Sequence, residues 1–304
     1  MTDSFHRPVM APETIGCLLQ VRPSIHLDCT LGDGGHALEI LRRSPETFVI
    51  GFDVDREALS VAEERLSREF KGRFLALKAD YRRLPEVLAE IGIPMVDTVL
   101  YDLGVSSRQL DTPERGFSYW GDGPLDMRMD LGRVLTARDI VMTYSEEELA
   151  RILAEYGEEK FARRIAREIV KARRNREIGT AGALVDIIKR AIPARARTGG
   201  GHPARRTFQA LRIEVNDEIR LLQRAILDGF YHLKPGGMIA VLSYHSLEDR
   251  VVKNTFRSLA GSGEANLVTR KPKTPGAEEV EENPRARSAK LRVAKREMAN
   301  GTLI

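Results

Sequence analysis

Cysteines and long apolar runs are scarce in this chain, and both absences limit the classes of protein to which it can belong. The two cysteines among 304 residues, Cys17 and Cys29, lack the C-x-x-C spacing of a zinc cluster or a disulfide framework. We therefore expect two small core residues and no metal site. No apolar stretch approaches the length of a membrane span, and the first residues lack the apolar core of a signal peptide. These absences predict a cytoplasmic protein.

Two common motifs of cofactor binding and catalysis are also missing. The glycines after the first predicted strand do not have the G-x-G-x-x-G spacing of a dinucleotide site. No G-x-S-x-G turn is present, and Ser243, His245 and Asp249 fall within one short segment, so a hydrolase triad is disfavoured. The hydrophobic content of 42% is enough for at least one large core, and the length favours two domains.

A glycine-rich turn follows the first predicted strand. In the segment Ile25–His36, an apolar run ends at Asp28 and is followed by Gly32, Gly34 and Gly35 before a helical pattern. A strand that enters such a turn is where α/β proteins hold nucleotide-like ligands. Glycines allow positive φ angles and a close approach of the ligand, and the new helix offers free amide groups. The turn therefore favours a ligand with a carboxylate or phosphate, and a tight turn without any ligand is the alternative.

Two acidic residues restrict this ligand further. Asp28 and Asp33 would repel a pyrophosphate placed between them. A cationic or zwitterionic ligand therefore fits the turn better than a dinucleotide.

Three further runs read as strands that end in, or lead into, acidic residues: Phe48–Asp53, Arg73–Lys78 with Asp80 and Tyr81, and Val96–Tyr101 with Asp102. Helical patterns such as Glu57–Phe70 separate the runs, so the strands should be parallel, with their carboxyl ends forming one ligand crevice. Asp53 stands where a carboxylate binds two ribose hydroxyls. An acid after a strand is often only a helix N-cap, and this alternative stays open for each of them.

The pattern changes in the middle of the chain. No strand pattern appears from Arg108 to about Pro203, where periodicity indicates helices over Glu146–Tyr156, Glu159–Arg173 and Ala183–Ala191. We therefore expect residues 1–110 and 207–304 to form one sheet domain, and residues 111–206 to form a helical domain inserted into it.

The last third of the chain returns to a mixed pattern. We expect five features there: a long helix over Thr207–Leu233, a strand over Gly237–Ser243, a helix over Leu247–Leu259 opened by capping-box residues Ser246–Asp249, an irregular loop over Pro272–Pro284, and an edge strand over Ser288–Arg296.

Positive charge is concentrated in one segment. Residues 160–212 hold fifteen Lys or Arg against three acids, whereas the whole chain has a net charge of only +4. Such asymmetry is expected of a surface that binds a polyanion, and it makes nucleic acid the natural partner. Part of the segment is amphipathic, so its arginines are alternatively a solvated helix face. Arg205 and Arg206 follow a glycine-rich loop with a histidine, a combination that suits contact with an RNA backbone.

These features indicate S-adenosylmethionine as the cofactor. They are a nucleoside-shaped pocket with acidic walls, an acid for the ribose, and Asp80 and Tyr81 for the base. Eight motifs in order, spread over nearly the whole chain, then resemble those of the bacterial MraW/RsmH family: His6–Met10, Asp28–His36, Asp102–Asp111, Arg115–Ser118, Gly123–Asp130, Pro203–Ile213, Ser243–Arg250 and Asn283–Arg292. Two positions depart from the family pattern, since Asp33 stands where the family usually has glycine and Tyr244 where it usually has phenylalanine.

The resemblance implies a class I S-adenosylmethionine-dependent methyltransferase, with a Rossmann-like, mostly parallel sheet and an inserted small all-α domain for substrate recognition. Family members methylate N4 of a cytidine in the decoding centre (P site) of 16S ribosomal RNA within the small ribosomal subunit. The implied cofactor contacts are Gly34, Gly35 and His36 at the methionine end, Asp53 at the ribose, Tyr81 beside adenine, and Asp102 and Gln109 for the remainder.

The residues for catalysis and RNA binding are assigned less firmly by the sequence than the cofactor contacts are. An exocyclic cytosine amine is a weak nucleophile, so the site must orient N4 and accept hydrogen bonds from it. Asp102 is our first candidate, and His245 is expected either to accept a proton or to position the base. Tyr244, with Arg205 and Arg206, is expected to contact the substrate, Tyr244 by stacking on the cytosine.

Two alternatives from other classes remain. A DNA amino-methyltransferase would share the cofactor pocket but prefer a deoxy substrate. A ribosome-assembly factor would bind the cofactor without turnover. The sequence leaves open whether the chain forms a homodimer.

Overall fold

The computed structural model describes residues 8–197 and 201–298. The chain divides into two compact units, of which unit 1 comprises Met1–Gly104 and Ile219–Ile304, and unit 2 comprises Val105–Glu218. Unit 2 therefore interrupts unit 1 in the sequence.

The limits of unit 2 extend beyond the expected residues 111 and 206. Val105 and Leu110 pack against the apolar core of unit 2 on the N-terminal side. Phe208, Leu211 and Val215 belong to the same core on the C-terminal side. Apolar packing therefore draws these flanking residues into the helical unit.

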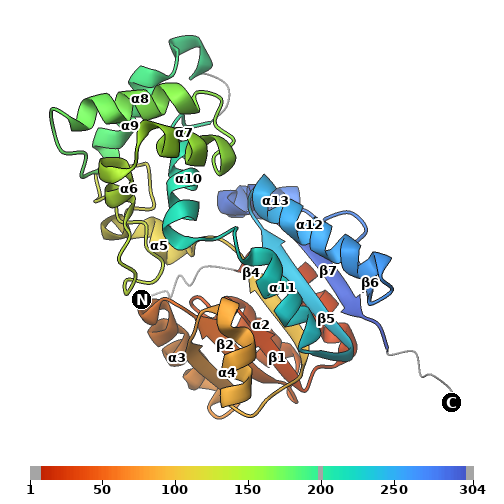
Figure 1. Cartoon of the computed structure of the whole chain (residues 1–304). Coiled ribbons are helices and arrows are strands. Elements are labelled where there is room, and N and C mark those ends of the chain that lie inside the picture. Colours follow the sequence, from red (N-terminus) through yellow and green to blue (C-terminus); the bar gives the residue numbers. More distant parts are fainter. Residues whose placement is uncertain (1–7, 198–200, 299–304) are drawn as a thin grey trace. The chain divides into compact units, whose positions relative to one another are not determined.

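A seven-stranded sheet with the order β3-β2-β1-β4-β5-β7-β6 forms the centre of unit 1 (Figure 1). Its strands are β1 (Ile25–Asp28), β2 (Phe48–Asp53), β3 (Phe74–Lys78), β4 (Val96–Asp102), β5 (Leu233–Ser243), β6 (Ala265–Leu267) and β7 (Lys290–Arg296). Strands β1 to β5 pair in parallel, and β7 is antiparallel to both β5 and β6. The expected mostly parallel sheet is confirmed.

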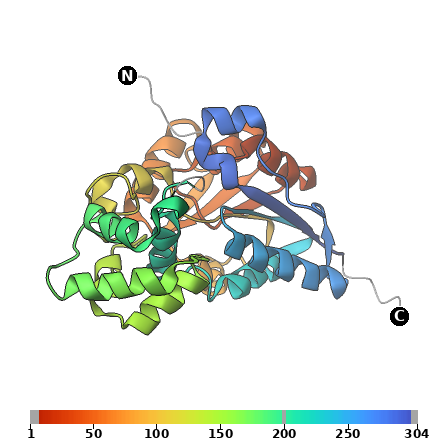
Figure 2. The same cartoon turned by 90° about the horizontal axis from the view of Figure 1, so that it is seen from above.

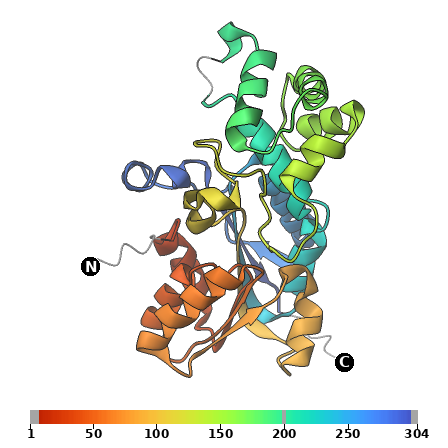
Figure 3. The same ribbon diagram turned by 90° about the vertical axis from the view of Figure 1, so that its left-hand side faces the viewer.

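Helices cover both faces of this sheet because its strands are apolar on both sides. Val49 and Leu100 contribute to the core under one face, whereas Ile50 and Tyr101 contribute to the core under the other. The first face carries α1 (Ala11–Leu18), α2 (Gly35–Arg43) and α3 (Arg56–Phe70), and the second carries α4 (Leu84–Glu90), α11 (Leu222–Tyr231) and α12 (Ser246–Gly261), as Figure 3 shows. The remaining helices of unit 1 are α13 (Ala277–Glu282) and the 3-10 turns η1 (Leu19–Val21), η2 (Tyr81–Arg83) and η5 (Pro284–Ser288).

Both cysteines lie in this unit and are buried free thiols, as expected. Of the helices within the described residues, none is both long and apolar enough to cross a membrane.

Unit 2 consists of helices around one apolar core. They are α5 (Ser107–Asp111), α6 (Ala137–Thr143), α7 (Glu146–Glu155), α8 (Ala162–Arg173), α9 (Ala181–Ala191) and α10 (Arg205–Asn216), with the 3-10 turns η3 (Pro113–Arg115) and η4 (Ala194–Ala196). Helices α7, α8 and α9 lie side by side, as Figure 2 shows. Ser145 and Glu148 form a capping box at the start of α7, and Ile165 and Ile169 bury one face of α8.

Two expectations about helices were wrong. The predicted helix over 207–233 is two helices, because Asp217 adopts a left-handed conformation (φ 53°) directly after α10. The predicted loop over 272–284 contains α13. In addition, the N-cap of α12 is His245 instead of Ser246.

The expectation of an edge strand near the C-terminus was also wrong. Strand β7 lies inside the sheet between β5 and β6, and four consecutive residues, Leu291 to Ala294, are buried. The edge of the sheet next to β7 is formed by β6, a strand of three residues that is too short to give a sequence pattern.

Candidate active site

Three carboxylates stand at the carboxyl ends of adjacent parallel strands. Asp28 ends β1, Asp53 ends β2 and Asp102 ends β4. Burial raises the pKa of Asp28 to about 7 and that of Asp53 to about 6. Because burial disfavours these negative charges, a ligand with a positive group would stabilise their ionised forms.

The glycine-rich turn is tied to the acid at the end of β2. Gly34 is the N-cap of α2 with a φ of 76°, and a Cβ there would lie 3.2 Å from that of Ala62. The amide of Gly32 donates to Asp53 Oδ2 over 2.8 Å, and the amide of Asp55 donates to Asp53 Oδ1 over 2.8 Å. These two bonds and a third from the Val54 backbone orient the Asp53 carboxylate, which retains one acceptor position for a ribose hydroxyl.

Asp102 is held from two sides. Its amide donates to Thr30 Oγ1 over 2.6 Å, which fixes the backbone at the end of β4. The Tyr244 hydroxyl donates to Asp102 Oδ1 over 2.6 Å. Burial, followed by the charge of Asp102, raises the pKa of Tyr244 well above its usual value, so the phenol stays a donor. The sequence did not reveal Thr30 as a partner, nor this role of Tyr244.

His36 lies on the other side of the Asp102 carboxylate. Its Nε2 is 3.4 Å from Asp102 Oδ2. Burial lowers the pKa of His36, but the negative charges of Asp102 and Asp28 outweigh this effect and raise the pKa above its usual value. Within residues 8–197 and 201–298, the buried His36 Nδ1 has no hydrogen-bond partner. A buried polar atom without a partner is unusual, and a bound ligand would satisfy it.

The donors and acceptors of this turn fit the zwitterionic end of an amino-acid ligand. His36 offers a ring nitrogen to a carboxylate, and Asp28 offers a negative charge to an ammonium or sulfonium group. This arrangement is compatible with the expected contacts to the methionine part of a cofactor. Those contacts, from Gly34, Gly35 and His36, stay a prediction.

Tyr81 opens η2 after β3 and lies edge-on to Tyr101, with ring centroids 5.5 Å apart and an interplanar angle of 88°. The Tyr101 hydroxyl donates to the carbonyl of Ala225 over 2.7 Å, which anchors the pair. The neighbouring Asp80 accepts hydrogen bonds from the backbone and the guanidinium of Arg82. Asp80 therefore caps the turn and pairs with an arginine, and Tyr81 remains the better candidate for contact with a base.

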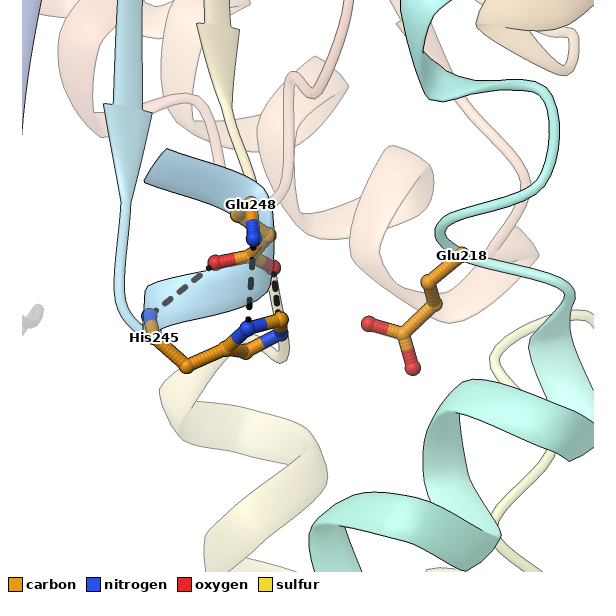
Figure 4. A group of neighbouring side chains, drawn as sticks. All are labelled: Glu218, His245 and Glu248. Atoms are coloured by element: carbon orange, nitrogen blue, oxygen red, sulfur yellow. Dashed lines mark hydrogen bonds and ion pairs between the residues drawn. The ribbon is translucent and has the colours of Figure 1, made fainter. Parts of the chain in front are cut away.

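His245 and Glu248 form a capping box at the start of α12, drawn in Figure 4. Glu248 Oε2 accepts from the amides of Tyr244 and His245 over 2.8 and 3.3 Å, and Glu248 Oε1 lies 3.2 Å from His245 Nε2. His245 Nδ1 accepts from the Glu248 amide over 3.4 Å. Nδ1 is therefore occupied by the cap, whereas the buried Nε2 lies beside the Glu248 carboxylate without a hydrogen bond among the described residues, an arrangement that favours a positioning role. Glu218, also drawn in Figure 4, belongs to unit 2, where it pairs with Arg212 over 2.7 Å.

Ser243 and Asp249 have partners of their own. The Ser243 hydroxyl donates to the carbonyl of Lys290 over 3.4 Å. Asp249 pairs with Lys290 Nζ at 3.2 Å and with Arg292 Nε at 2.7 Å. These contacts join α12 and β5 to β7 and leave no Ser-His-Asp relay.

Three expected site residues belong to unit 2. Gln109 is buried, and its Oε1 accepts from the Ser106 amide over 3.1 Å in the capping box of α5. Arg205 is exposed at the start of α10, whereas Arg206 Nη1 donates to the carbonyl of Glu158 over 3.0 Å. The roles of these three residues toward cofactor and RNA stay predictions.

Comparison with known proteins gives consistent matches over nearly the whole chain. A family model described as the MraW methylase family matches residues 3–297. A protein named ribosomal RNA small subunit methyltransferase H from Symbiobacterium thermophilum is 51% identical over 304 residues, covering 94% of this chain and 95% of that protein. Proteins of the same name are 48% identical in Halothermothrix orenii, covering 96% of this chain and 98% of the relative, and 47% identical in Clostridioides difficile, covering 91% and 94%.

Proposed function

The chain belongs to the MraW methylase family, and we propose that it transfers the methyl group of S-adenosylmethionine to N4 of a cytidine in the decoding centre of 16S ribosomal RNA. The observation that carries this proposal is the Asp102 carboxylate, held by Tyr244 and His36 at the end of β4. A ribosomal RNA substrate would place the protein in the cytoplasm.

Residues at the carboxyl ends of β1, β2 and β4 would hold the proposed cofactor. S-adenosylmethionine supplies an electrophilic methyl group on a positively charged sulfur. Asp53 binds the ribose hydroxyls, Tyr81 lies beside the adenine, and His36 donates to the methionine carboxylate. The buried Asp28 carboxylate favours the cationic cofactor, because burial raises its pKa to about 7 even though the charge of His36 lowers it, and a positive group on the ligand would stabilise the ionised form.

Asp102 orients the amine for transfer. The lone pair of the cytosine amine is delocalised into the ring, so the nucleophile gains from an acceptor that binds an N4 hydrogen and aligns N4 with the methyl group. Formation of the N4–CH₃ bond breaks the S–CH₃ bond, and N4 then loses one proton. We assign that proton to Asp102 and not to His245, because both nitrogens of His245 face Glu248.

RNA binding is assigned to the exposed basic residues of unit 2. Arg163, Arg164 and Arg167 all lie on the exposed face of α8, opposite its buried isoleucines. Arg205 adds an exposed guanidinium at the start of α10. Phosphate contacts of this type position the RNA and make the affinity depend on salt.

The test is methyl transfer to small ribosomal subunits from a strain that lacks this gene. The protein is incubated with these subunits and methyl-labelled S-adenosylmethionine, the RNA is digested, and labelled nucleosides are identified by mass spectrometry. We expect label in N4-methylcytidine with the wild type and strongly reduced label with Asp102→Asn, whereas Glu57→Gln serves as a control. In a parallel incubation with DNA, label in DNA and none in the subunits would replace the proposal by a DNA amino-methyltransferase. Cofactor binding without any transfer would replace it by an assembly factor.

A further inference from the structure

An exposed indole and two stacked rings stand together in unit 2. Trp120 is 71% exposed. The ring of Tyr119 stacks on that of His202, with centroids 4.6 Å apart and an interplanar angle of 6°, and the Trp120 ring lies 4.7 Å from His202. Phe208 supports Tyr119 from the core in an edge contact at 5.8 Å. One aromatic side chain is thus left facing solvent on a platform that the core keeps in place.

These rings line a hollow of about 540 Å³ between the loop that precedes α6 and helix α9. We call it the aromatic pocket. Besides the three rings, its charged lining residues are Asp122, Arg176, Asp186 and Lys189. All of these residues belong to unit 2, and they lie apart from the strand ends of unit 1 in the sequence.

The polar groups of the aromatic pocket suit a nucleotide. Arg176 and Lys189 are exposed cations able to bind a phosphate. Asp122 Oδ1 accepts from the Gly182 amide over 3.2 Å, which fixes a carboxylate that can accept from the amino group of a base. Burial, followed by the charge of Lys189, lowers the pKa of His202, which favours the neutral form of the ring.

A fully apolar or fully acidic hollow would suit other ligands. Here aromatic faces, two cations and one fixed carboxylate occur together, a combination that suits an unpaired base of RNA. The hollow also belongs to the unit that carries the basic segment 160–212.

We propose that the aromatic pocket is a second RNA site, which holds one unpaired base of the ribosomal RNA substrate stacked on Trp120, with the adjoining phosphate on Lys189 or Arg176. This inference rests on the proposed function, because it takes the RNA to be the substrate of methyl transfer. The bound base is distinct from the target cytidine, whose N4 must reach Asp102.

The single tryptophan of the chain makes the test direct, since all indole fluorescence comes from Trp120. A short single-stranded oligoribonucleotide with an end label is titrated into the protein with saturating S-adenosylhomocysteine. Quenching of the indole fluorescence measures binding of RNA in the aromatic pocket, and the anisotropy of the label measures total binding of RNA to the protein. We expect both signals to saturate at the same RNA concentration.

Variants then separate the pocket from the rest of the surface. Trp120→Ala is expected to weaken binding roughly tenfold and Trp120→Phe much less, because stacking needs an aromatic face. Leu131→Ala removes another exposed apolar side chain of unit 2 and is expected to bind as the wild type does. Far-ultraviolet circular dichroism of each variant checks the fold.

Two results would overturn the inference, and they differ from each other. In the first, the wild type methylates subunits and binds the oligoribonucleotide, but its indole is not quenched or Trp120→Ala binds with full affinity. The pocket is then not an RNA site, and the proposed function stands. If the wild type neither methylates subunits nor binds the RNA, the proposed function fails and the inference fails with it.

Discussion

The hydroxyl of Tyr244 donates a 2.6 Å hydrogen bond to Asp102 Oδ1, and the two residues are 142 positions apart in the sequence. The bond joins the end of β4 to the residue that follows β5. Because β4 and β5 are adjacent parallel strands, their ends meet at the same edge of the sheet. Tyr244 therefore fixes the carboxylate that we assign to the reacting amine.

Removal of this hydroxyl should slow methyl transfer without weakening cofactor binding. A hydrogen bond to a charged group contributes about 1.5–3 kcal/mol, so Tyr244→Phe should lower kcat roughly tenfold to a hundredfold. The Kd for S-adenosylhomocysteine, measured by calorimetry, should stay within about twofold, since Asp53 and Tyr81 are unchanged. Tyr231→Phe alters an exposed tyrosine and is the matched control. An unchanged kcat would show that Asp102 needs no support from Tyr244.

Substitution of Asp53 tests the ribose assignment. Asp53→Asn keeps one acceptor oxygen for the turn but removes the charge and one acceptor, so cofactor affinity should fall roughly tenfold to a hundredfold. Asp53→Ala should also loosen the turn, because the amides of Gly32 and Asp55 lose their acceptor. Calorimetric titration with S-adenosylhomocysteine measures both variants, and wild-type affinity in Asp53→Asn would refute the assignment.

The buried Asp28 should make stability depend on pH. Its pKa of about 7 in the folded protein exceeds the usual 3.8, so the folded state binds the proton more tightly, and its contribution to stability is lost as pH rises from about 4 to 7. His36, with its raised pKa, acts in the same direction, whereas His26, with a pKa lowered to about 3 by burial, acts in the opposite one.

The difference between wild type and Asp28→Asn isolates the effect of Asp28. Relative to the wild type, the variant should gain roughly 2 kcal/mol of unfolding free energy between pH 5 and pH 7.5 in the absence of cofactor. Urea denaturation at the two pH values measures this gain. Parallel pH profiles for the two proteins would contradict the raised pKa.

The two arginines at the start of α10 should behave differently. Arg205 is exposed, so Arg205→Ala should weaken RNA binding and reduce the salt slope by about one, with stability unchanged. Arg206→Ala should in addition cost about 1 kcal/mol of stability, because its bond to the Glu158 carbonyl is lost. Arg224→Ala in unit 1 is the control for general charge loss. The measurement is the RNA affinity of each variant over a range of salt concentrations. An unchanged slope of affinity against salt would mean that these arginines only form a solvated helix face.

Strands β1 to β4 could be predicted because each is a short apolar run that ends in or near an acid. The predicted run Phe48–Asp53 coincides with β2, and Val96–Tyr101 differs from β4 by one residue. The left-handed turn at Asp217 and the strand β6 could not be predicted, since neither a single backbone angle nor three residues leave a periodic pattern.

The partners within the site were also beyond prediction. Strand ends indicated Asp28, Asp53 and Asp102, but the sequence cannot tell which side chain reaches Asp102 from a distant strand. Glu248 had a local signal, because it lies three residues after His245, the spacing of a capping box. That signal was assigned to Ser246 as the cap, one residue too late.

The position of β7 has a consequence for the synthesis of the chain. Ser243 at the end of β5 pairs with Lys290 of β7, which leaves the ribosome 47 residues later. Until then, the newly made β5 presents an apolar edge with unpaired backbone groups, the kind of edge at which chains aggregate. Premature termination in that interval should therefore yield aggregation-prone fragments, even though the strands that carry Asp28, Asp53 and Asp102 have already been made.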